Sequence, residues 1–459
     1  MILLVTSLGV FIAQFDSLVV NLALKHIGSD LNANVSQLQW VMDSYNLLYA
    51  TLLLTGGALG DLYGRTRMFV AGIGLVVAGS IVCMIAPNVT TLIAGRAITG
   101  VGAALDVPIS LAILTVAYSD ARQRARALGI WASCNGVAIA LGPTFGGLAV
   151  DAFGWRSVCV LVLPICFVAM ALAWKCVPET RDPKGRSLDI AGQALAITAL
   201  GALCYAAIEA PHVGWTSPSS LASMAIFAVT AAWFFHVEKG QRGALVPLDL
   251  FRNGEFNAAL VAAGTMTFGI YGMVFLTPLY LQNVGHLSAF AVGLYLLPLS
   301  ISFIVISQLS GLLAQKFGAR ALMTAGLGLM GGGLLLLTTV SAVPDPMLIE
   351  SALLIIGAGL GLNTAPVNGV AVASVPAARS GTASGVINTV RMVGAALGVA
   401  VLGAIYAVHQ GDADPQAALP GLRLAYFVGG CVELAGALTA LLFIRADSME
   451  QKHRTAAAR

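Results

Sequence analysis

Charged residues are scarce in this sequence: Asp, Glu, Lys and Arg make up only 10% of its 459 residues, whereas 58% are hydrophobic. Soluble domains carry roughly 25% charged residues. A chain of this length could not cover a water-exposed surface with so little charge, which excludes a soluble enzyme, a secreted disulfide scaffold and a disordered chain. The mean hydropathy of +0.88 indicates a protein that crosses a membrane many times.

Sites that would hold a cofactor or a metal are also missing from the sequence. The seven cysteines are scattered through apolar segments without metal or disulfide spacing, so we interpret them as small hydrophobic residues. The sequence contains no phosphate-binding glycine loop, no Walker motif and no cluster of metal ligands. We therefore expect no cofactor, no metal, no enzymatic activity and no nucleic-acid partner.

Long apolar runs fill most of the chain. A helix needs about 20 apolar residues to span the hydrocarbon core, and a β-barrel would instead show short alternating segments. The runs predict an all-α integral membrane protein. Its fourteen expected transmembrane helices lie at about 2–24, 38–60, 67–86, 90–118, 126–149, 156–176, 190–209, 219–238, 255–282, 289–314, 320–341, 347–372, 380–408 and 421–444.

Lys and Arg are distributed unevenly between these spans. Of the 24 Lys and Arg residues, nineteen fall in the loops after even-numbered spans or in the C-terminal tail, and three fall in the other loops. The remaining two, Arg96 and Arg391, lie within spans. Because loops rich in Lys and Arg stay in the cytoplasm, both termini are predicted to be cytoplasmic.

An internal repeat predicts a duplicated architecture. GALGDLYGRT (57–66) and GLLAQKFGAR (311–320) match at two glycines and a leucine, and each follows the second helix of its half. Two pseudo-symmetric six-helix halves with two helices between them explain the count of fourteen. The expected divisions are an N-terminal half (1–177), two inserted helices with their loops (178–253), a C-terminal half (254–445) and a cytoplasmic tail (446–459).

The segment GALGDLYGRTR, which we call the signature loop (residues 57–67), resembles the loop between helices two and three of the major facilitator superfamily. The resemblance covers nearly the whole chain and is closest to the fourteen-helix drug:proton antiporter branch. It implies that the loop is a latch that stabilises one access state; the alternative is a loop that only retains positive charge inside. Leu62 replaces the basic residue that the family commonly has there. The implied latch residues are Gly57, Asp61, Gly64, Arg65 and Arg67.

Two further segments carry the resemblance. LIAGRAITGVGAAL (92–105) resembles the fourth-helix motif, in which an arginine lies within the membrane. GVAIALGPTFGG, the antiporter motif (residues 136–147), resembles the helix-five motif that separates exporters from importers in the family. The alternative for this motif is ordinary glycine-mediated packing. Its small residues and kinking proline are Gly136, Gly142, Pro143, Gly146 and Gly147.

Several ionisable residues are predicted to lie inside the membrane, where a charge costs about 2.5–3.5 kcal/mol. Depth along the helices matches Asp43 with Arg96 in the N-terminal half and Arg391 with Glu433 in the C-terminal half. We interpret the second pair as a buried structural pair. Asp16 has no depth-matched arginine. Because burial disfavours the charged form of a carboxylate, such a group can bind a proton. We assign proton coupling to Asp16, Asp43 and Arg96.

Asp106 is a peculiarity of this chain, because family members usually have an apolar residue there. It either tunes substrate charge or is a polar group that bonds a neighbouring helix. Aromatic rings favour flat or cationic ligands. The predicted substrate cavity therefore includes four aromatic residues, Tyr49, Trp131, Tyr271 and Phe275. Asp106 is added to it because its charge could select cationic substrates.

The resemblance implies a monomeric, proton-coupled antiporter in the cytoplasmic membrane of a bacterium. It would bind small molecules and protons and export hydrophobic, cationic drugs or toxic compounds by alternating access. One alternative is an exporter of an endogenous metabolite, such as an antibiotic or siderophore. A more remote alternative is a non-transporting receptor on the same scaffold.

Overall fold

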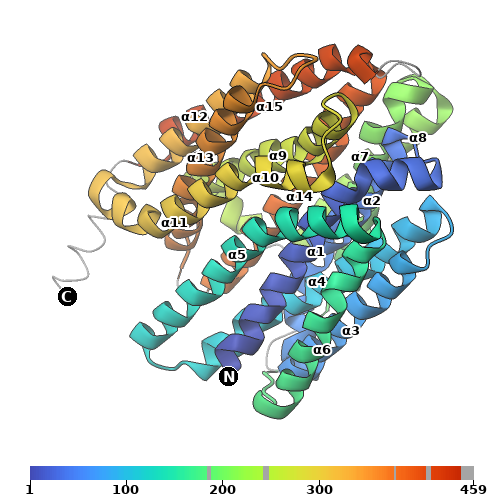
Figure 1. Cartoon of the computed structure of the whole chain (residues 1–459). Helices are drawn as coiled ribbons and strands as arrows, with labels where there is room; N and C mark the ends of the chain where they lie inside the picture. Colours follow the sequence, from blue (N-terminus) through green and yellow to red (C-terminus); the bar gives the residue numbers. More distant parts are fainter. Residues whose placement is uncertain (183–187, 241–247, 377–378, 410–414, 446–459) are drawn as a thin grey trace. The chain divides into compact units, whose positions relative to one another are not determined.

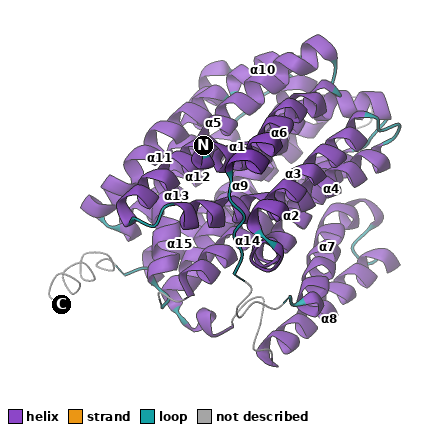
Figure 2. Ribbon diagram, turned by 90° about the horizontal axis from the view of Figure 1, so that it is seen from below, coloured by secondary structure: helices purple, strands orange, loops and turns teal. Residues whose placement is uncertain are grey.

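A computed structural model of the chain describes residues 1–182, 188–240, 248–376, 379–409 and 415–445. All regular elements in these ranges are helices (Figures 1 and 2). The first eight are α1 (Ile2–Leu31), α2 (Val35–Tyr63), α3 (Arg65–Met84), α4 (Val89–Ala117), α5 (Ala121–Phe153), α6 (Ser157–Cys176), α7 (Ile190–Val213) and α8 (Pro218–Gly240). The others are η1 (Leu248–Arg252), α9 (Gly254–Asn283), α10 (Ala289–Tyr295), α11 (Leu297–Phe317), α12 (Ala319–Leu337), α13 (Pro346–Ala373), α14 (Ser380–Val408), η3 (Pro415–Ala418) and α15 (Leu419–Phe443). The predicted tail lies outside the described residues.

The all-helical fold is confirmed, with one difference in the predicted tenth span. That span is divided at Leu296 into α10 and α11, because Pro298 in the first turn of α11 has no amide hydrogen to continue the helix. With this pair taken as one span, the described helices account for the fourteen predicted spans. Among the described residues, thirteen helical segments are long and apolar enough to cross a membrane, with α10 and α11 counted as one. The remaining helix, α2, is 29 residues long and contains polar residues such as Asp43 and Asn46.

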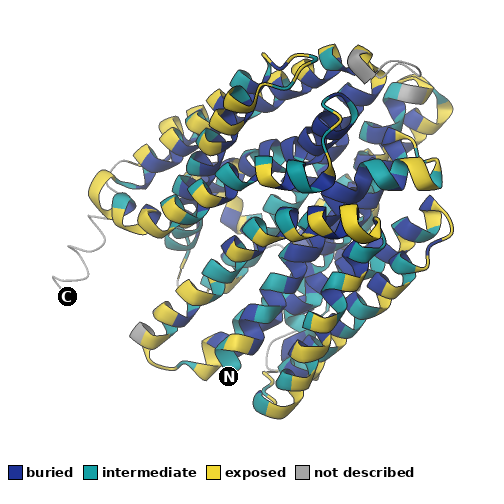
Figure 3. Ribbon diagram, in the orientation of Figure 1, coloured by how far each residue is buried: buried dark blue, intermediate teal, exposed yellow. Residues whose placement is uncertain are grey.

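The chain divides into two compact units. The first comprises Met1–Leu245 and His286–Leu294, and the second comprises Val246–Gly285 and Tyr295–Arg459. Helices α7 and α8 therefore group with the first six helices. The side-chain amide of Gln193 on α7 donates to the Thr51 carbonyl of α2 at 2.9 Å. By contrast, only 11% of the residues in the most apolar stretch of α8 are buried. This exposure is expected for a helix that faces lipid (Figure 3).

Small residues allow the helices of each unit to approach closely. In the first unit, a Cβ added at Gly79 of α3 would lie 2.7 Å from the Gly95 carbonyl of α4. In the second unit, Gly398 of α14 lies against the backbone of α9 at Phe268. Helices in lipid associate through this kind of packing rather than through a hydrophobic driving force. The high glycine content therefore has a structural explanation in both units.

Candidate functional site

Arg96 forms a buried ion pair inside the first unit. Its Nη1 donates to Asp16 Oδ2 of α1 at 2.6 Å, and both side chains are buried. Its Nε donates to the Val41 carbonyl of α2 at 3.3 Å, and the guanidinium lies 4.6 Å from the centre of the Tyr45 ring. The Tyr45 hydroxyl in turn donates to the Ala13 carbonyl at 2.8 Å. Arg96 therefore joins α4 to both α1 and α2.

This geometry corrects two predictions. Arg96 does not pair with Asp43, and Asp16 does have an arginine partner. Asp43 and Arg96 lie at similar depths in the membrane, but a shared depth does not determine which side chains form an ion pair. The direction of a side chain around its helix axis also decides its neighbours, and Asp16 is the carboxylate on the face of α1 that meets α4.

Asp43 is fully buried, and neither carboxylate oxygen makes a hydrogen bond of normal geometry with a described residue. Asn46, one turn along α2, is its polar neighbour. Helix α7 lies against this part of α2: Cys204 interacts electrostatically with Asp43, and the rings of Trp40 and Tyr205 have centroids 6.5 Å apart. The inserted helix α7 thus helps to enclose an unpaired carboxylate.

Asp106 is also fully buried, and its two carboxylate oxygens have no hydrogen-bond partner among the described residues. A Cβ added at Gly9 of α1 would lie 2.6 Å from one of these oxygens and 2.8 Å from the Phe69 ring of α3. The carboxylate therefore lies where α1, α3 and α4 meet within the first unit. Among the described residues, neither oxygen makes the bond to a neighbouring helix that one alternative expected, and the role of Asp106 in substrate preference stays a prediction.

The second unit does not contain the predicted Arg391–Glu433 pair. Both Glu433 oxygens, and Nε and Nη2 of Arg391, lack a hydrogen-bond partner among the described residues. Glu433 of α15 points toward Gly269 of α9, whereas Arg391 of α14 interacts electrostatically with Tyr271. The two side chains share a depth, but they face different neighbours, so the prediction of a pair was wrong.

The signature loop forms a tight turn between α2 and α3. Gly64 has a φ of +111°, a backbone conformation that glycine adopts more readily than other residues. Asp61 accepts hydrogen bonds from Arg65 at 3.0 Å (Nε) and 2.8 Å (Nη2). The structure therefore gives Asp61 a basic partner from its own loop.

Glu179, which the sequence did not single out, fixes this turn from the segment after α6. Its carboxylate accepts the backbone amides of Thr66 at 3.0 Å and Arg67 at 3.1 Å, the first turn of α3. The Arg67 side chain lies 3.7 Å from the same carboxylate. Two backbone hydrogen bonds reinforce the attachment, from Arg65 to the Thr180 carbonyl and from Asp182 to the Asp61 carbonyl. Glu179 is 113 residues from Thr66, so no local pattern indicates the contact.

The antiporter motif is a close-packing surface on α5, which continues as one helix through Pro143. Gly136 is buried. Gly142 and Gly146 face Leu18 and Val19 of α1. On another side, Gly147 lies against the Ala289 carbonyl of α10 and the Pro143 carbonyl lies against Gly293. The glycines therefore pack closely against α1 and α10, as the alternative for this motif expected, and the role of the motif in transport direction stays a prediction.

Asp151, also missed in the sequence, secures the contact between α5 and α10. Its two carboxylate oxygens accept the backbone amides of Ala289 at 3.0 Å and Phe290 at 2.8 Å. These amides have no partner within their own helix. Asp151 lies four residues after the antiporter motif, which is the signal that could have identified it.

The predicted cavity aromatics lie in both units. Tyr49 is buried beside Tyr45, with ring centroids 5.8 Å apart, and Trp131 Nε1 donates to Ser110 Oγ at 3.1 Å. In the second unit, Tyr271 is half-buried and Phe275 is fully buried within α9. Phe275 thus has the surroundings of a core residue. Among the described residues, no group of three or more His, Cys, Asp or Glu side chains could hold a metal.

Two bacterial resistance proteins are similar in sequence to this chain over most of its length. It is 38% identical over 405 residues to the Multidrug resistance protein Stp of Mycobacterium tuberculosis, covering 88% of this chain and 75% of that protein. It is 33% identical to the Methylenomycin A resistance protein of Streptomyces coelicolor, covering 92% of this chain and 89% of that protein.

Solved structures share the fold. The peptide transporter POT in complex with sulfate superposes with a TM-score of 0.72 at 18% identity, covering 96% of this chain and 93% of the transporter. The profile of the family described as Major Facilitator Superfamily matches residues 6–399. The chain is thus a multi-pass membrane transporter rather than an enzyme, and it belongs to the Major Facilitator Superfamily.

Proposed function

We propose that this protein is a proton-coupled antiporter that exports hydrophobic, cationic compounds from a bacterial cytoplasm by alternating access. The named relatives support drug export, because their names refer to multidrug and antibiotic resistance. The antiporter motif on α5 supports export rather than import. The protein acts as a monomer in the cytoplasmic membrane, with both termini in the cytoplasm, as the distribution of Lys and Arg favours.

One observation supports coupling most directly: the Asp16–Arg96 ion pair lies in the same helix bundle as the unpaired Asp43. A proton on Asp16 would remove the charge that Arg96 pairs with and leave the guanidinium buried without compensation, which is costly. Binding of a proton to Asp16 would therefore weaken the contact between α1 and α4. Asp43, enclosed by α7, is the second carboxylate that can carry a proton as a neutral acid.

The signature loop supplies the conformational control in this proposal. The Asp61–Arg65 pair and the Glu179 carboxylate hold the turn between α2 and α3 in one geometry. A cycle of alternating access needs at least two arrangements that differ little in free energy. Contacts that hold this turn stabilise one of them, which is the role of a latch.

Aromatic side chains account for the expected substrates. Tyr49 and Trp131 in the first unit and Tyr271 in the second are our candidates for contact with flat, cationic compounds. Tyr271 also interacts electrostatically with Arg391. Substrate binding at Tyr271 would therefore change the surroundings of a buried cation.

The experiment uses the purified protein in vesicles with an imposed pH gradient and a panel of lipophilic cationic dyes. Adding a substrate dye should dissipate the gradient, and a protonophore should abolish dye accumulation. Dye transport that persists without any ion gradient would contradict proton antiport. Dissipation without dye movement would contradict coupling.

The second candidate function is export of one specific antibiotic. The name of the Streptomyces coelicolor relative refers to a single compound, methylenomycin A. A resistance panel in an efflux-deficient host separates the two candidates. Protection against many unrelated cations supports the first, and protection against one compound supports the second.

A further inference from the structure

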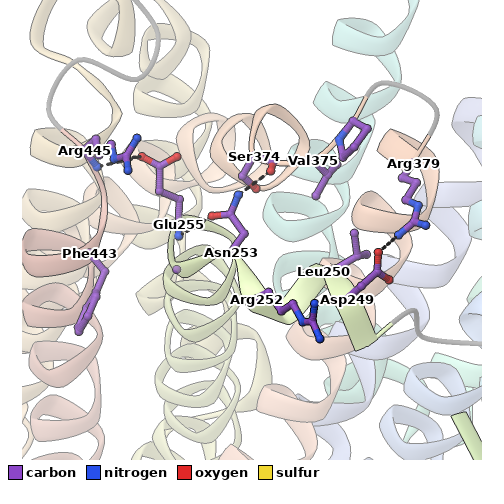
Figure 4. A pocket seen from close by; sticks show the side chains of 12 residues that line it. Asp249, Leu250, Arg252, Asn253, Glu255, Ser374, Val375, Arg379, Phe443 and Arg445 are labelled. Carbon is purple, nitrogen blue, oxygen red and sulfur yellow. Dashed lines mark hydrogen bonds and ion pairs between the residues drawn. The ribbon is translucent and has the colours of Figure 1, made fainter. Parts of the chain in front are cut away.

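Several helix ends of the second unit meet around a cavity of about 760 Å³ (Figure 4). Its walls come from η1, the first turn of α9, the segments that follow α13 and precede α14, and the end of α15. Asn253 joins two of these elements: its side-chain amide donates to the Ser374 carbonyl at 2.7 Å, and its oxygen accepts the Glu255 amide at 2.9 Å. A volume of this size is typical of small-ligand sites.

The walls carry more positive than negative charge. Three arginines, Arg252, Arg379 and Arg445, face two carboxylates, Asp249 and Glu255. Arg379 forms an ion pair with Asp249, and Figure 4 shows the two side chains turned toward each other. Among the described lining residues, positive charge therefore exceeds negative charge by one.

Arg252 and Arg445 retain free donors. Arg252 is exposed and makes no hydrogen bond or ion pair with the described residues. Arg445 approaches Glu255 only to 3.9 Å, and 86% of its side-chain surface is exposed. A guanidinium has five donor hydrogens and binds phosphate oxygens in a bidentate manner. Figure 4 shows them on opposite sides of the cavity, with Arg445 next to Glu255 and Arg252 next to Asp249. Each of these side chains can therefore bind a phosphate oxygen on its own side.

The apolar part of the cavity lies on the same side as Arg445 (Figure 4). Phe443, the last residue of α15, is more than half exposed, and Arg445 follows it by two residues. Arg252 precedes the first residue of α9 by two residues. Both arginines are thus at the ends of candidate spans, at the depth of the lipid headgroups, while Phe443 lies at the edge of the hydrocarbon region.

We propose that this cavity binds the headgroup of an anionic phospholipid, with the phosphate on Arg445, an acyl chain along Phe443 beside it, and Arg252 adding to the positive charge that attracts the headgroup. The distribution of Lys and Arg places these helix ends on the cytoplasmic side, where anionic lipids give the membrane surface a negative potential. A zwitterionic phospholipid also has a phosphate, but it brings no net negative charge to compensate the excess arginine. The site therefore selects lipids by net charge.

Native mass spectrometry of the full chain in detergent tests this site, with phosphatidylglycerol, phosphatidylethanolamine and inorganic phosphate titrated separately. Arg252→Gln and Arg445→Gln remove the donors. Arg320→Gln, on the first turn of α12 and outside the cavity, is the matched control. The melting temperature in detergent checks that each variant is folded.

We expect each cavity substitution to weaken phosphatidylglycerol binding about five-fold, since one arginine near an anionic surface contributes that factor. The control variant should bind like the unmodified chain, phosphatidylethanolamine should bind equally weakly to all, and inorganic phosphate should not displace the lipid. Unchanged phosphatidylglycerol binding in the double variant would overturn the site. An equal loss in Arg320→Gln would show a general charge effect instead. Displacement by inorganic phosphate would show a free-anion site.

Discussion

Arg96 Nη1 lies 2.6 Å from Asp16 Oδ2, and this ion pair joins α4 to α1 inside the first unit. Neither side chain is accessible enough for water to compensate the charge of the other. Asp16→Asn should therefore destabilise the protein by about 3–5 kcal/mol, because it leaves a buried, uncompensated cation. It should also abolish gradient-driven export of all substrates. Thermal unfolding in detergent and dye transport in vesicles measure the two effects.

The double variant Asp16→Asn/Arg96→Gln separates a structural role from coupling. Without either charge, stability should recover most of the loss, because the desolvation cost of both ions disappears. Transport should stay absent, since the proton site is still missing. A double variant that transports with a normal dependence on the pH gradient would show that the pair only holds the fold together.

Asp43 gives a different prediction, because its carboxylate has no arginine or lysine partner among the described residues, and only the Asn46 side chain is its polar neighbour. Asn has nearly the shape of the neutral acid, so Asp43→Asn should leave the melting temperature unchanged or higher. Proton-driven accumulation should disappear, whereas exchange of labelled for unlabelled substrate without a gradient should persist. Ser44→Ala, on the next residue of α2 and also buried, is the control and should retain both activities. Loss of exchange in Asp43→Asn would instead assign the residue to substrate binding.

Properties that depend on hydrophobicity along the chain could be predicted from the sequence. The expected span 156–176 agrees with helix α6 (Ser157–Cys176), and the expected span 255–282 agrees with helix α9 (Gly254–Asn283). Partners of buried charges could not be predicted in the same way. Depth follows from residue number and helix rise, but the facing neighbour depends on the rotation of each helix about its axis and on which helices are adjacent.

Contacts between distant segments were missed for a related reason. Glu179 lies in a short loop after α6, and its sequence neighbourhood contains no helix cap or ligand pattern that points to α3. Its role depends on the fold that brings it to Thr66 and Arg67. By contrast, Gly64 belongs to the signature loop that the sequence identifies, and its positive φ explains why glycine occupies that position.

Glu179→Gln should weaken the turn between α2 and α3. The neutral amide loses the charge that favours a helix N-terminus, so we expect a loss of about 1 kcal/mol, measurable as a lower melting temperature. The variant should also expose residues 178–182 to limited proteolysis. Glu350→Gln, an exposed position on α13, is the control. Equal effects of both variants would mean that net charge, not the cap, determines the change.

Two glycines on α5 test the antiporter motif. Gly147 lies against the Ala289 carbonyl, whereas a Cβ added at Gly129 meets no atom within 4 Å. Gly147→Ala should force α5 and α10 apart at a cost of about 1–3 kcal/mol, and transport should fall with it. Gly129→Ala should be neutral or slightly stabilising, because alanine favours a helix. If both variants transport like the unmodified protein, close packing at the motif has no part in the cycle.

Substitution of Asp106 tests whether this carboxylate recognises substrate or only packs between helices. A carboxylate in contact with a cationic substrate should contribute about 1–3 kcal/mol to its binding, or roughly five- to hundred-fold in affinity, and nothing to a neutral one. If Asp106 recognises substrate charge, Asp106→Asn should lower efflux of the cationic compound selectively; if it only packs against Gly9 between α1 and α4, the ratio of cationic to neutral efflux should stay unchanged. Efflux of one cationic and one neutral compound, each compared with Asp16→Asn, measures this ratio. Asp16→Asn should abolish export of both compounds. A selective loss of the cationic compound in Asp106→Asn would instead place this carboxylate in the substrate cavity.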